Sequence, residues 1–370
     1  DPDTSVDLDD AFSVCDYGEN VEQLSIYISN VTIWMDVLNL WKSFSNRIST
    51  IYLPDRKRPM LPTMLSDCLC SLQSGHTRLA FVMDIFINKG TDEVIDMKYT
   101  NCMINVHKNY AYEENSLLSN PDYNFLLDMT RRLTKQYRYM TNIKDSHDVV
   151  AYLMIFMNYN TGKDLMKYKN GIFRSTILNK DAVIPENIDE NVGKFLKMWN
   201  SSSGQYIDMN MLKEGQTVEH ELLEMESYIH ITSPIRRLVD LLNIIQFQKN
   251  HNMLELSAES YDFYKKLVGD IEYINTTMRS IRKVQNDCSL LHYCSTHPEV
   301  MSGEYKGFMF DKMERNDGLY QYVVYLPELK LISRIVVTNN IDNYTQHTFT
   351  LYLFHDEDRF KKKIRIQLKT

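Results

Sequence analysis

Hydrophobic and polar residues alternate along the chain with two periods, and the period changes several times. Residues 24–32 place Leu24, Ile26 and Ile28 on one side, which predicts a half-buried strand. Apolar residues at three- and four-residue steps then predict a helix through Val37, Trp41, Phe44 and Ile48. Beyond it, the patterns predict strands over 79–105, helices over 121–168, and loops with short helices over 171–225.

Residues 256–295 predict one long amphipathic helix. Its apolar side chains form a seven-residue repeat of Tyr264, Leu267, Ile271, Ile274, Met278 and Ile281. Two interpretations remain open: the apolar face packs on the core of the same chain, or it forms a coiled coil with a partner. Packing within the chain is the ordinary outcome for such a face.

From Gly303 onward the pattern changes to short strands. They are predicted at Tyr305–Phe310, Leu319–Leu326, Leu331–Val337, Thr348–Phe354 and Ile364–Leu368. Asn316-Asp317-Gly318 predicts a hairpin turn, because its central positions tolerate positive φ. Five strands in this length fit a small OB-type barrel. In the last strand, Lys363, Arg365, Gln367 and Lys369 alternate with Ile364, Ile366 and Leu368.

Composition and charge narrow the function classes. The 370 residues are 44% hydrophobic and 24% charged, which is ordinary globular usage. A net charge of −8 argues against a uniformly basic nucleic-acid coat protein, but not against a nucleic-acid enzyme with a carboxylate metal site. The longest apolar run, Val149–Met157, is far shorter than the ~20 residues that span a bilayer, so no membrane association is expected.

The first residues of the chain and its cysteines bear on its length and on its cellular compartment. No signal peptide or initial Met opens the sequence, so we expect a fragment of a longer protein. The six cysteines form no CxxC pair, which favours a reducing, intracellular and cytoplasmic setting. Zinc and core packing are the alternatives for the short cluster of Cys288, His292, Cys294 and His297. Packing is favoured because 288, 292 and 294 do not share a helix face.

The first candidate for chemistry is the opening Asp1-Pro2-Asp3-Thr4-Ser5-Val6-Asp7-Leu8-Asp9-Asp10-Ala11. Five carboxylates within ten residues repel one another unless a cation lies among them. Carboxylates are preferred ligands of Mg²⁺, and a pair of such ions can support phosphodiester hydrolysis. A solvated acidic segment and a calcium-type loop remain alternatives.

A second motif, Tyr228 to Asp240, reads Tyr-Ile-His-Ile-Thr-Ser-Pro-Ile-Arg-Arg-Leu-Val-Asp. Thr232 and Ser233 before Pro234 predict a cap and the first turn of a helix. Such a helix would direct backbone N–H groups and Arg236 at an anion. Arginine suits phosphate because its planar fork donates two hydrogen bonds.

Together these motifs resemble the ribonuclease II / ribonuclease R family of 3′→5′ exoribonucleases, which includes the catalytic subunit of the eukaryotic exosome. The opening is similar to the family's DPxxxxDxDDA signature, and His230 to Arg237 to its HFTSPIRR. Further similar stretches are Ser29-Asn30-Val31-Thr32, Tyr52-Leu53-Pro54-Asp55-Arg56, Pro59-Met60-Leu61-Pro62, Leu65 to Leu72, and Arg78-Leu79-Ala80. The resemblance covers roughly residues 1–295.

The resemblance implies an α+β fold: an RNB catalytic domain over 1–298, with a mixed sheet and surrounding helices, then an OB-fold barrel over 303–370. It also implies Mg²⁺-dependent release of 5′-mononucleotides from the 3′ end of single-stranded RNA, with Mn²⁺ as an alternative ion. The basic strand Lys361 to Lys369 would then either contact RNA or be solvated.

Site residues also follow from the resemblance. It implies metal ligation by Asp1, Asp7, Asp9 and Asp10, with Asp9 catalytic, while Asp3 falls at a variable position. Arg236 matches the arginine at the scissile phosphate, followed by Arg237 as a further RNA contact. Tyr112 matches a tyrosine near the scissile bond. Tyr52 matches an aromatic that stacks on a base, with core packing as its alternative.

Three departures from the family pattern stand out. The helix that carries two glutamates in the family, gripping the 3′-terminal nucleotide, has Ala151 and Tyr152 instead. About thirty residues with a second stacking aromatic are missing before it, and the family's His-Arg is replaced by Ile244-Ile245. Without the two glutamates, we expect a weaker preference for a 3′-terminal ribose, and Tyr152→Glu is expected to restore part of it. The Tyr152 phenol could accept one hydrogen bond from the terminal nucleotide or stack on the last base. The rival to an exoribonuclease is therefore a catalytically weakened RNA-binding or scaffold protein.

Overall fold

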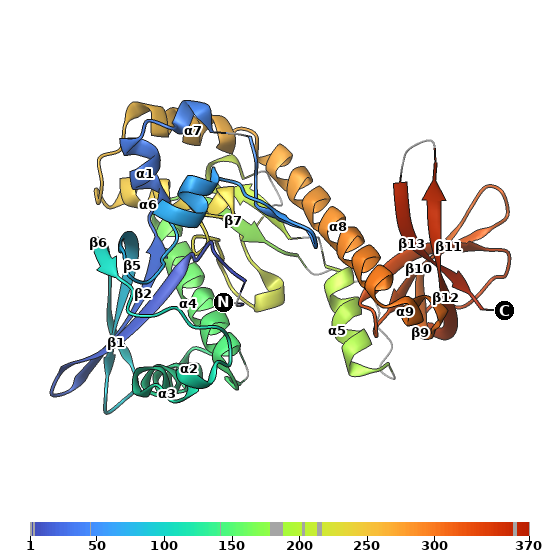
Figure 1. Cartoon of the computed structure of the whole chain (residues 1–370), viewed down its shortest axis with the longest axis horizontal. Helices are drawn as coiled ribbons and strands as arrows, with labels where there is room; N and C mark the ends of the chain where they lie inside the picture. The colour runs from blue at the N-terminus through green and yellow to red at the C-terminus, as the bar shows by residue number, and fades with distance from the viewer. Residues whose placement is uncertain are drawn as a thin grey trace. The chain divides into compact units, whose positions relative to one another are not determined.

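The computed structural model describes residues 2, 4–44, 46–140, 142–177, 188–201, 204–212, 217–357 and 361–369. The chain divides into two compact units (Figure 1). The first comprises Asp1–Ile51, Arg58–Ile177 and Ser202–Met278, and the second comprises Tyr52–Lys57, Leu178–Ser201 and Arg279–Thr370. The domain boundary between 298 and 303 stays a prediction.

The first unit contains a four-stranded sheet in the order β1-β2-β5-β6. These strands are β1 (Asp10–Gly18), β2 (Val21–Ser29), β5 (Thr77–Asn88) and β6 (Val94–Asn105). All their described pairings are antiparallel, so the α+β class is confirmed but the expectation of a mixed sheet is wrong for this sheet. A separate antiparallel hairpin joins β7 (Ile172–Ser175) and β8 (Gln205–Asp208).

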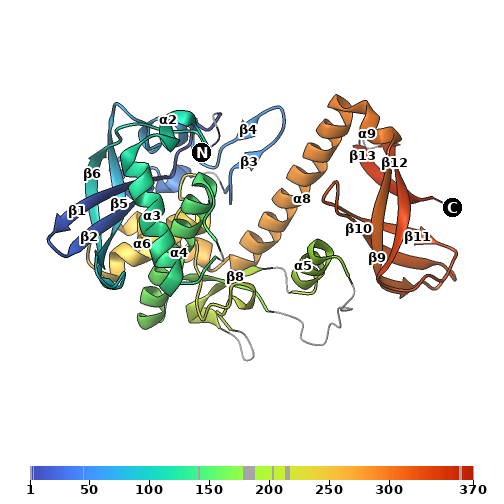
Figure 2. The same cartoon turned by 90° about the horizontal axis from the view of Figure 1, so that it is seen from below.

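Helices cover the sheet and form a second core beside it. They are α1 (Val31–Val37), α2 (Asn115–Leu118), α3 (Pro121–Gln136), α4 (Ser146–Lys167), α6 (Leu238–Asn250) and α7 (Ala258–Val268). The shorter helical turns are η1 (Trp41–Ser43), η2 (Met64–Leu69), η3 (Met209–Met211) and η4 (Glu221–Leu223). Figure 2 shows α3 and α4 lying along the sheet. One face of β2, with Leu24, Ile26 and Ile28 fully buried, packs in the same core as both helices.

The helix predicted through Val37, Trp41, Phe44 and Ile48 is wrong. Helix α1 ends at Val37, Asn39 takes a left-handed φ of 51°, and only the short turn η1 follows. A left-handed residue after the last turn ends a helix. Trp41 and Ile48 are nevertheless buried in the core of the first unit, so the apolar spacing marked burial rather than one continuous helix.

The long helix predicted over 256–295 is interrupted. α7 ends at Val268, and α8 (Ile271–Thr296) begins after Gly269 and Asp270. Glycine weakens a helix interior because it loses the most backbone freedom there. The repeat from Tyr264 to Met278 packs in the core of the first unit, which confirms packing within the chain for that part of the face.

The second unit contains a nearly closed five-stranded antiparallel barrel in the order β11-β10-β9-β12-β13. Its strands are β9 (Glu304–Glu314), β10 (Tyr320–Leu326), β11 (Leu331–Val337), β12 (Thr345–Asp356) and β13 (Lys361–Leu368). The unit also contains α5 (Glu190–Trp199), α9 (Pro298–Ser302) and most of α8. On α5, Phe195 stacks on Tyr325 of the barrel, with ring centroids 3.7 Å apart. The barrel is consistent with the predicted OB fold.

Three further predictions concern the second unit. The alternation in β13 is confirmed, because Ile364 and Ile366 are buried while Arg365 and Gln367 are exposed. The hairpin between β9 and β10 also forms, but of its three turn residues only Gly318 has positive φ, at 77°. Cys294 lies in the core of this unit, as the packing interpretation predicted.

The region 171–225 contains more regular structure than predicted, since β7, β8 and α5 fall within it. A small hairpin of β3 (Ile51–Tyr52) and β4 (Lys57–Arg58) was also missed. Among the described residues, no helix combines the length and apolar character needed to cross a bilayer.

Candidate functional site

The described part of the acidic motif is held by backbone hydrogen bonds to two other segments. The Leu8 N–H donates to Ser71 Oγ (3.1 Å), and the Leu8 carbonyl accepts from the Leu72 N–H (2.9 Å). The Asp9 carbonyl accepts from the Ser29 N–H (2.8 Å). Three stretches that share the family resemblance therefore meet at the start of β1.

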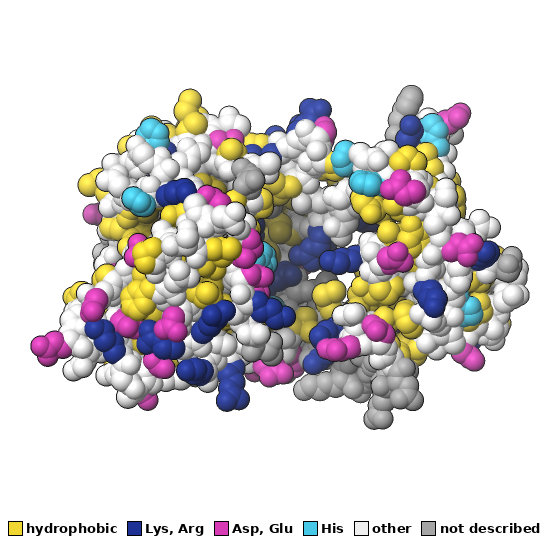
Figure 3. All heavy atoms as spheres, turned by 60° about the horizontal axis from the view of Figure 1, so that its bottom comes forward, with side chains coloured by type: hydrophobic (Ala, Val, Ile, Leu, Met, Phe, Trp, Pro, Cys, Tyr) yellow, Lys and Arg dark blue, Asp and Glu magenta, His cyan; other side chains and the backbone are white. Residues whose placement is uncertain are grey.

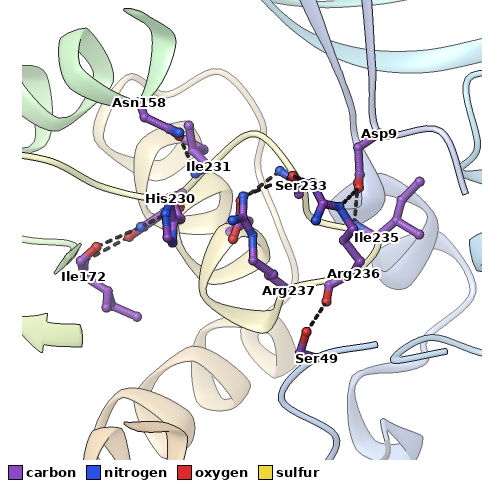
Figure 4. Close-up of polar contacts among 12 residues, drawn as sticks. Asp9, Ser49, Asn158, Ile172, His230, Ile231, Ser233, Ile235, Arg236 and Arg237 are labelled. Atoms are coloured by element: carbon purple, nitrogen blue, oxygen red, sulfur yellow. Dashed lines mark hydrogen bonds and ion pairs between the residues drawn. The ribbon is translucent and has the colours of Figure 1, made fainter. Parts of the chain in front are cut away.

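Asp9 joins the beginning of the chain to the second motif (Figure 4). Its side chain is only 2% exposed. Asp9 Oδ1 accepts from the Ile235 N–H at 2.8 Å, and Asp9 Oδ2 accepts from Arg236 Nε at 3.1 Å. These two motifs, predicted separately, form one buried contact.

The predicted helix start at Thr232-Ser233-Pro234 is wrong. Helix α6 begins at Leu238, and the residues before it form a turn. The Arg236 carbonyl accepts from the Thr50 N–H (2.9 Å) and Ser49 Oγ (2.8 Å), contacts that hold this segment outside the helix. The amides expected to meet an anion are occupied, since the Ser233 N–H donates to Asp240 and the Ile235 N–H to Asp9.

Arg236 and Arg237 differ in exposure. The Arg236 side chain is 42% exposed, and its Nη2 donates to Ser233 Oγ at 2.9 Å. The Arg237 side chain is 20% exposed, and its Nη2 donates to Asp240 Oδ1 (2.8 Å) and Ser233 Oγ (3.0 Å). Arg236 is thus the better placed of the two for a ligand. Contact of Arg237 with RNA stays a prediction, and its geometry favours a structural role.

Two carboxylates of the motif, Asp9 and Asp10, are desolvated. Burial raises the pKa of Asp9 to about 7 against the opposing effect of Arg236, and neighbouring Asp10 adds to the rise. Burial also raises the pKa of Asp10. Excess negative charge out of water is costly, and a divalent cation with oxygen ligands would offset it. The donor set therefore fits a hard metal ion.

The geometry of the four-aspartate set is only partly described. Asp1 lies outside the described residues, as does Asp3, and Asp7 is half-buried. The described aspartates Asp7, Asp9 and Asp10 do not bring three ligand atoms within 4.8 Å of one another. Metal ligation by these residues stays a prediction.

In the described chain, three potential ligands do meet at Asp145, His147 and Asp148. Asp145 caps α4 by accepting from the Asp148 N–H (2.9 Å), and Asp148 Oδ2 accepts from the Lys144 N–H (2.8 Å). The N-terminus of a helix carries partial positive charge, which disfavours a cation. Helix capping accounts for this group. The four-residue cluster of Cys288 to His297 forms no such group among the described residues.

A cavity of about 570 Å³ opens beside Asp10. Its walls come from β1, the segment 104–112, and the first turns of α3 and α4. Aromatic side chains line much of it, namely Phe12, Tyr27, Tyr110, Tyr112 and Tyr123. Because every base has a stacking face, such a cavity beside carboxylates fits a nucleotide.

Tyr112 lies within electrostatic reach of both motifs. Burial raises the pKa of the Tyr112 hydroxyl, Asp10 raises it further and Arg236 opposes the rise. The structure therefore brings three of the predicted residues, Asp10, Arg236 and Tyr112, into one neighbourhood.

The segment that carries Tyr112 is fastened to α4 by contacts that the sequence did not predict. Glu113 Oε1 accepts from the Ser146 N–H (2.8 Å) and Oγ (2.7 Å), and the Glu113 N–H donates to Ser146 Oγ (3.1 Å). Glu113 has a φ of 57°, which costs energy in a residue other than glycine. The Tyr112 ring also lies 5.2 Å from that of His147. The only signal in the sequence was that Glu113 adjoins Tyr112.

Tyr52 lies in the β3–β4 hairpin, where it is 40% exposed. It belongs to the second compact unit. Its exposure does not favour the core-packing alternative, and base stacking stays a prediction.

The expectation that Tyr152 contacts the 3′-terminal nucleotide is wrong. Tyr152 is fully buried in the core of the first unit, and its hydroxyl donates to the Tyr137 carbonyl at 3.0 Å. Burial raises the pKa of its hydroxyl. The face of α4 that lines the cavity presents Ser146, Val149 and Val150 instead.

We therefore expect the Tyr152→Phe and Tyr152→Glu proteins to differ in stability. Tyr152→Phe loses one hydrogen bond and costs about 1 kcal/mol, whereas Tyr152→Glu buries an unpaired carboxyl and costs about 3–5 kcal/mol. Urea unfolding measures both. A Tyr152→Glu protein that is as stable as wild type and has an altered preference for a 3′-terminal deoxyribose would instead show that Tyr152 contacts the substrate.

Comparisons with known proteins show which family this chain is similar to. Residues 1–122 match the family model described as RNB domain. Ribonuclease R of Buchnera aphidicola subsp. Schizaphis graminum is 26% identical over 313 residues, which cover 67% of this chain and 43% of that protein. This chain spans less than half the length of the curated ribonucleases R that it matches.

Solved structures show the same fold. Mycoplasma genitalium RNase R, in complex with ribose-methylated single-stranded RNA, matches with a TM-score of 0.67 at 18% identity, covering 100% of this chain and 67% of that one. Yeast Ssd1, described as a pseudonuclease, matches with a TM-score of 0.70 at 13% identity, covering 88% of this chain and 47% of that one. The resemblance to the ribonuclease II / ribonuclease R family is thus confirmed, and residues 1–122 match the model of its RNB domain.

Proposed function

We propose that this chain is the catalytic part of a metal-dependent 3′→5′ exoribonuclease that degrades single-stranded RNA to 5′-mononucleotides. The observation that carries the proposal is the buried contact of Asp9 with Ile235 and Arg236, beside the aromatic cavity that Asp10 and Tyr112 line. That arrangement unites carboxylates, a partly exposed arginine and a space for a base.

Each residue has a distinct role in this proposal. Asp1, Asp7, Asp9 and Asp10 would hold Mg²⁺ or Mn²⁺, which supplies an activated water and neutralises charge on the phosphate. Arg236, held by Asp9 and Ser233, directs its guanidinium at the scissile phosphate. Tyr112 orients the last nucleotide, and the neighbouring aromatic rings exclude water from its base.

The contacts of Asp9 give its carboxylate a second role. The hydrogen bond that Asp9 accepts from Nε restricts the rotamers of Arg236. A guanidinium held before substrate arrives loses less conformational freedom on binding and stabilises developing charge without reorganisation. Asp9 thereby links the metal and the phosphate parts of the site.

The setting of the proposed enzyme is intracellular and cytoplasmic. All six cysteines are unpaired, as is typical of a reducing compartment. Single-stranded RNA is the proposed partner.

The alternative function is a catalytically weakened RNA-binding or scaffold protein. One observation favours it: α4 presents Val149 and Val150 to the cavity, and it has Ala151 and the buried Tyr152 in place of the two family glutamates. The altered helix affects the grip on the 3′ end, whereas the acidic motif and Arg236 are present.

One assay separates the two functions. The chain is incubated with uniformly labelled single-stranded RNA and Mg²⁺, with Mn²⁺, or with EDTA. An exoribonuclease releases 5′-mononucleotides with either metal and none with EDTA. RNA binding without any metal-dependent product would instead support the scaffold function.

A further inference from the structure

A second cavity lies further along α3, in the first unit. It has a volume of about 530 Å³ and is lined by the second half of α3 and the segment leading to α4. Three cationic side chains, Arg131, Lys135 and Arg138, line it, and we name it the basic pocket. All three side chains are exposed, and Arg131 Nε donates to the Ile143 carbonyl at 3.1 Å.

These cations contrast with their neighbour Arg132. Arg132 contacts three carboxylates, those of Glu22, Asp92 and Asp128. Within the described residues, none of the three cations of the basic pocket forms an ion pair with a carboxylate. The whole chain carries a net charge of −8, so this concentration of unpaired positive charge is local and not a result of composition.

The spacing of the cations suits a polyanion. Arg131 and Lys135 are four residues apart and therefore lie on the same face of α3. Like charges at this spacing destabilise a helix slightly, and an anion between them removes the cost. An arginine guanidinium can donate two hydrogen bonds to one phosphate, and the half-buried Met140 adds apolar surface for a sugar or base.

The position of the basic pocket connects it to the cavity beside Asp10. The first turns of α3 line that cavity with Asp122, Tyr123 and Leu126. At ~1.5 Å per residue, Arg131 lies roughly 8–14 Å further along the helix axis. A single RNA strand that occupies the cavity can reach this distance within a few nucleotides.

We propose that Arg131, Lys135 and Arg138 form a phosphate-binding site for the backbone of single-stranded RNA, separate from the hydrolytic residues. The identity of the ligand rests on the proposed function, and the charge and shape of the pocket do not. The site holds the strand by its backbone, so it contributes affinity without sequence preference.

The experiment measures binding in EDTA, so that it does not depend on hydrolysis. The variant Arg131→Ala/Lys135→Ala/Arg138→Ala is compared with wild type by anisotropy of a fluorescent oligoribonucleotide between about 50 and 200 mM KCl. Loss of three phosphate contacts should make the slope of log K against log salt shallower by about 2, and weaken binding about tenfold at the lower salt. A dinucleotide that fills only the cavity should bind both proteins equally.

A matched control removes the same charge elsewhere on the first unit. Lys167→Ala/Lys265→Ala/Lys266→Ala changes three exposed lysines on α4 and α7 and should leave the slope unchanged. Arg131→Lys/Arg138→Lys keeps the charge, so it should keep the slope while binding somewhat more weakly. Thermal melts establish that each variant is folded.

The outcomes distinguish this site from the proposed function. An unchanged slope in the folded triple variant, or an equal change in the control, would overturn the phosphate site even if the wild type releases mononucleotides. A shallower slope confined to the triple variant supports the site even if no hydrolysis is found, in which case the exoribonuclease proposal fails and this one stands.

Discussion

Asp9→Asn is expected to abolish RNA hydrolysis, by at least about 10³-fold, while single-stranded RNA still binds. The amide oxygen can keep the hydrogen bond from the Ile235 N–H, but the amide nitrogen cannot accept from Arg236 Nε. The substitution therefore removes a carboxylate from the proposed metal site and one of the hydrogen bonds that hold Arg236. Because the lost hydrogen bond involves two charged groups, we also expect a cost of about 1–3 kcal/mol in stability.

The measurement is mononucleotide release by Asp9→Asn with Mg²⁺, together with urea unfolding. Asp16→Asn is the matched control, because Asp16 lies on the same strand, is exposed and pairs with Lys89 away from the cavity. Asp10→Asn should lose activity with less effect on stability, since no hydrogen bond to Arg236 depends on it. If Asp9→Asn hydrolyses RNA at the wild-type rate, Asp9 is not a metal ligand.

Arg236→Lys should lower kcat by roughly 10²-fold or more. The guanidinium of Arg236 donates at once to Asp9 from Nε and to Ser233 from Nη2, which aims its remaining edge. A lysine ammonium keeps the charge but not the planar fork. Binding of RNA should change far less than turnover, because the charge that attracts phosphate remains.

Steady-state kinetics separate the two effects, and chemical rescue identifies the group. Added guanidinium should restore part of the activity of Arg236→Ala, whereas a purely structural arginine would show no rescue. Arg315→Lys, at an exposed pair on the barrel, serves as the control for an arginine of no catalytic role. If the turnover rate of Arg236→Lys lies within a factor of about two of wild type, Arg236 has only a structural role in the turn.

The period of apolar residues was enough to predict most of the secondary structure that holds the site. Alternation at Leu24 to Ile28 is confirmed as β2, and the strands after Gly303 are confirmed as a barrel. The same period did not locate helix ends. A helix ends where a residue adopts a left-handed conformation, as Asn39 does, or where a backbone group hydrogen-bonds to another part of the chain. Contacts of the second kind depend on distant residues.

The motifs of the sequence by themselves determined the family resemblance and the residue types at the site. Only the tertiary structure decided which of these residues meet. Asp9 and Arg236 are 227 positions apart, and their contact exists because the sheet and α6 bury both motifs together. The Ser233 and Ile235 amides of the second motif donate to carboxylates of the same chain. They therefore do not form the anion site that was predicted at a helix start, and the segment is a turn instead.

The structure alone also decided where Tyr152, one of the departures from the family pattern, lies. Sequence spacing could not tell whether Tyr152 faces a ligand or the core, because one helical turn contains both directions. Packing against Tyr137, Tyr139 and Phe156 settles that it is buried. Likewise, the sequence indicates only an ordinary charged helix surface at Arg131, Lys135 and Arg138. These residues line a pocket because the segment before α4 lies beside them.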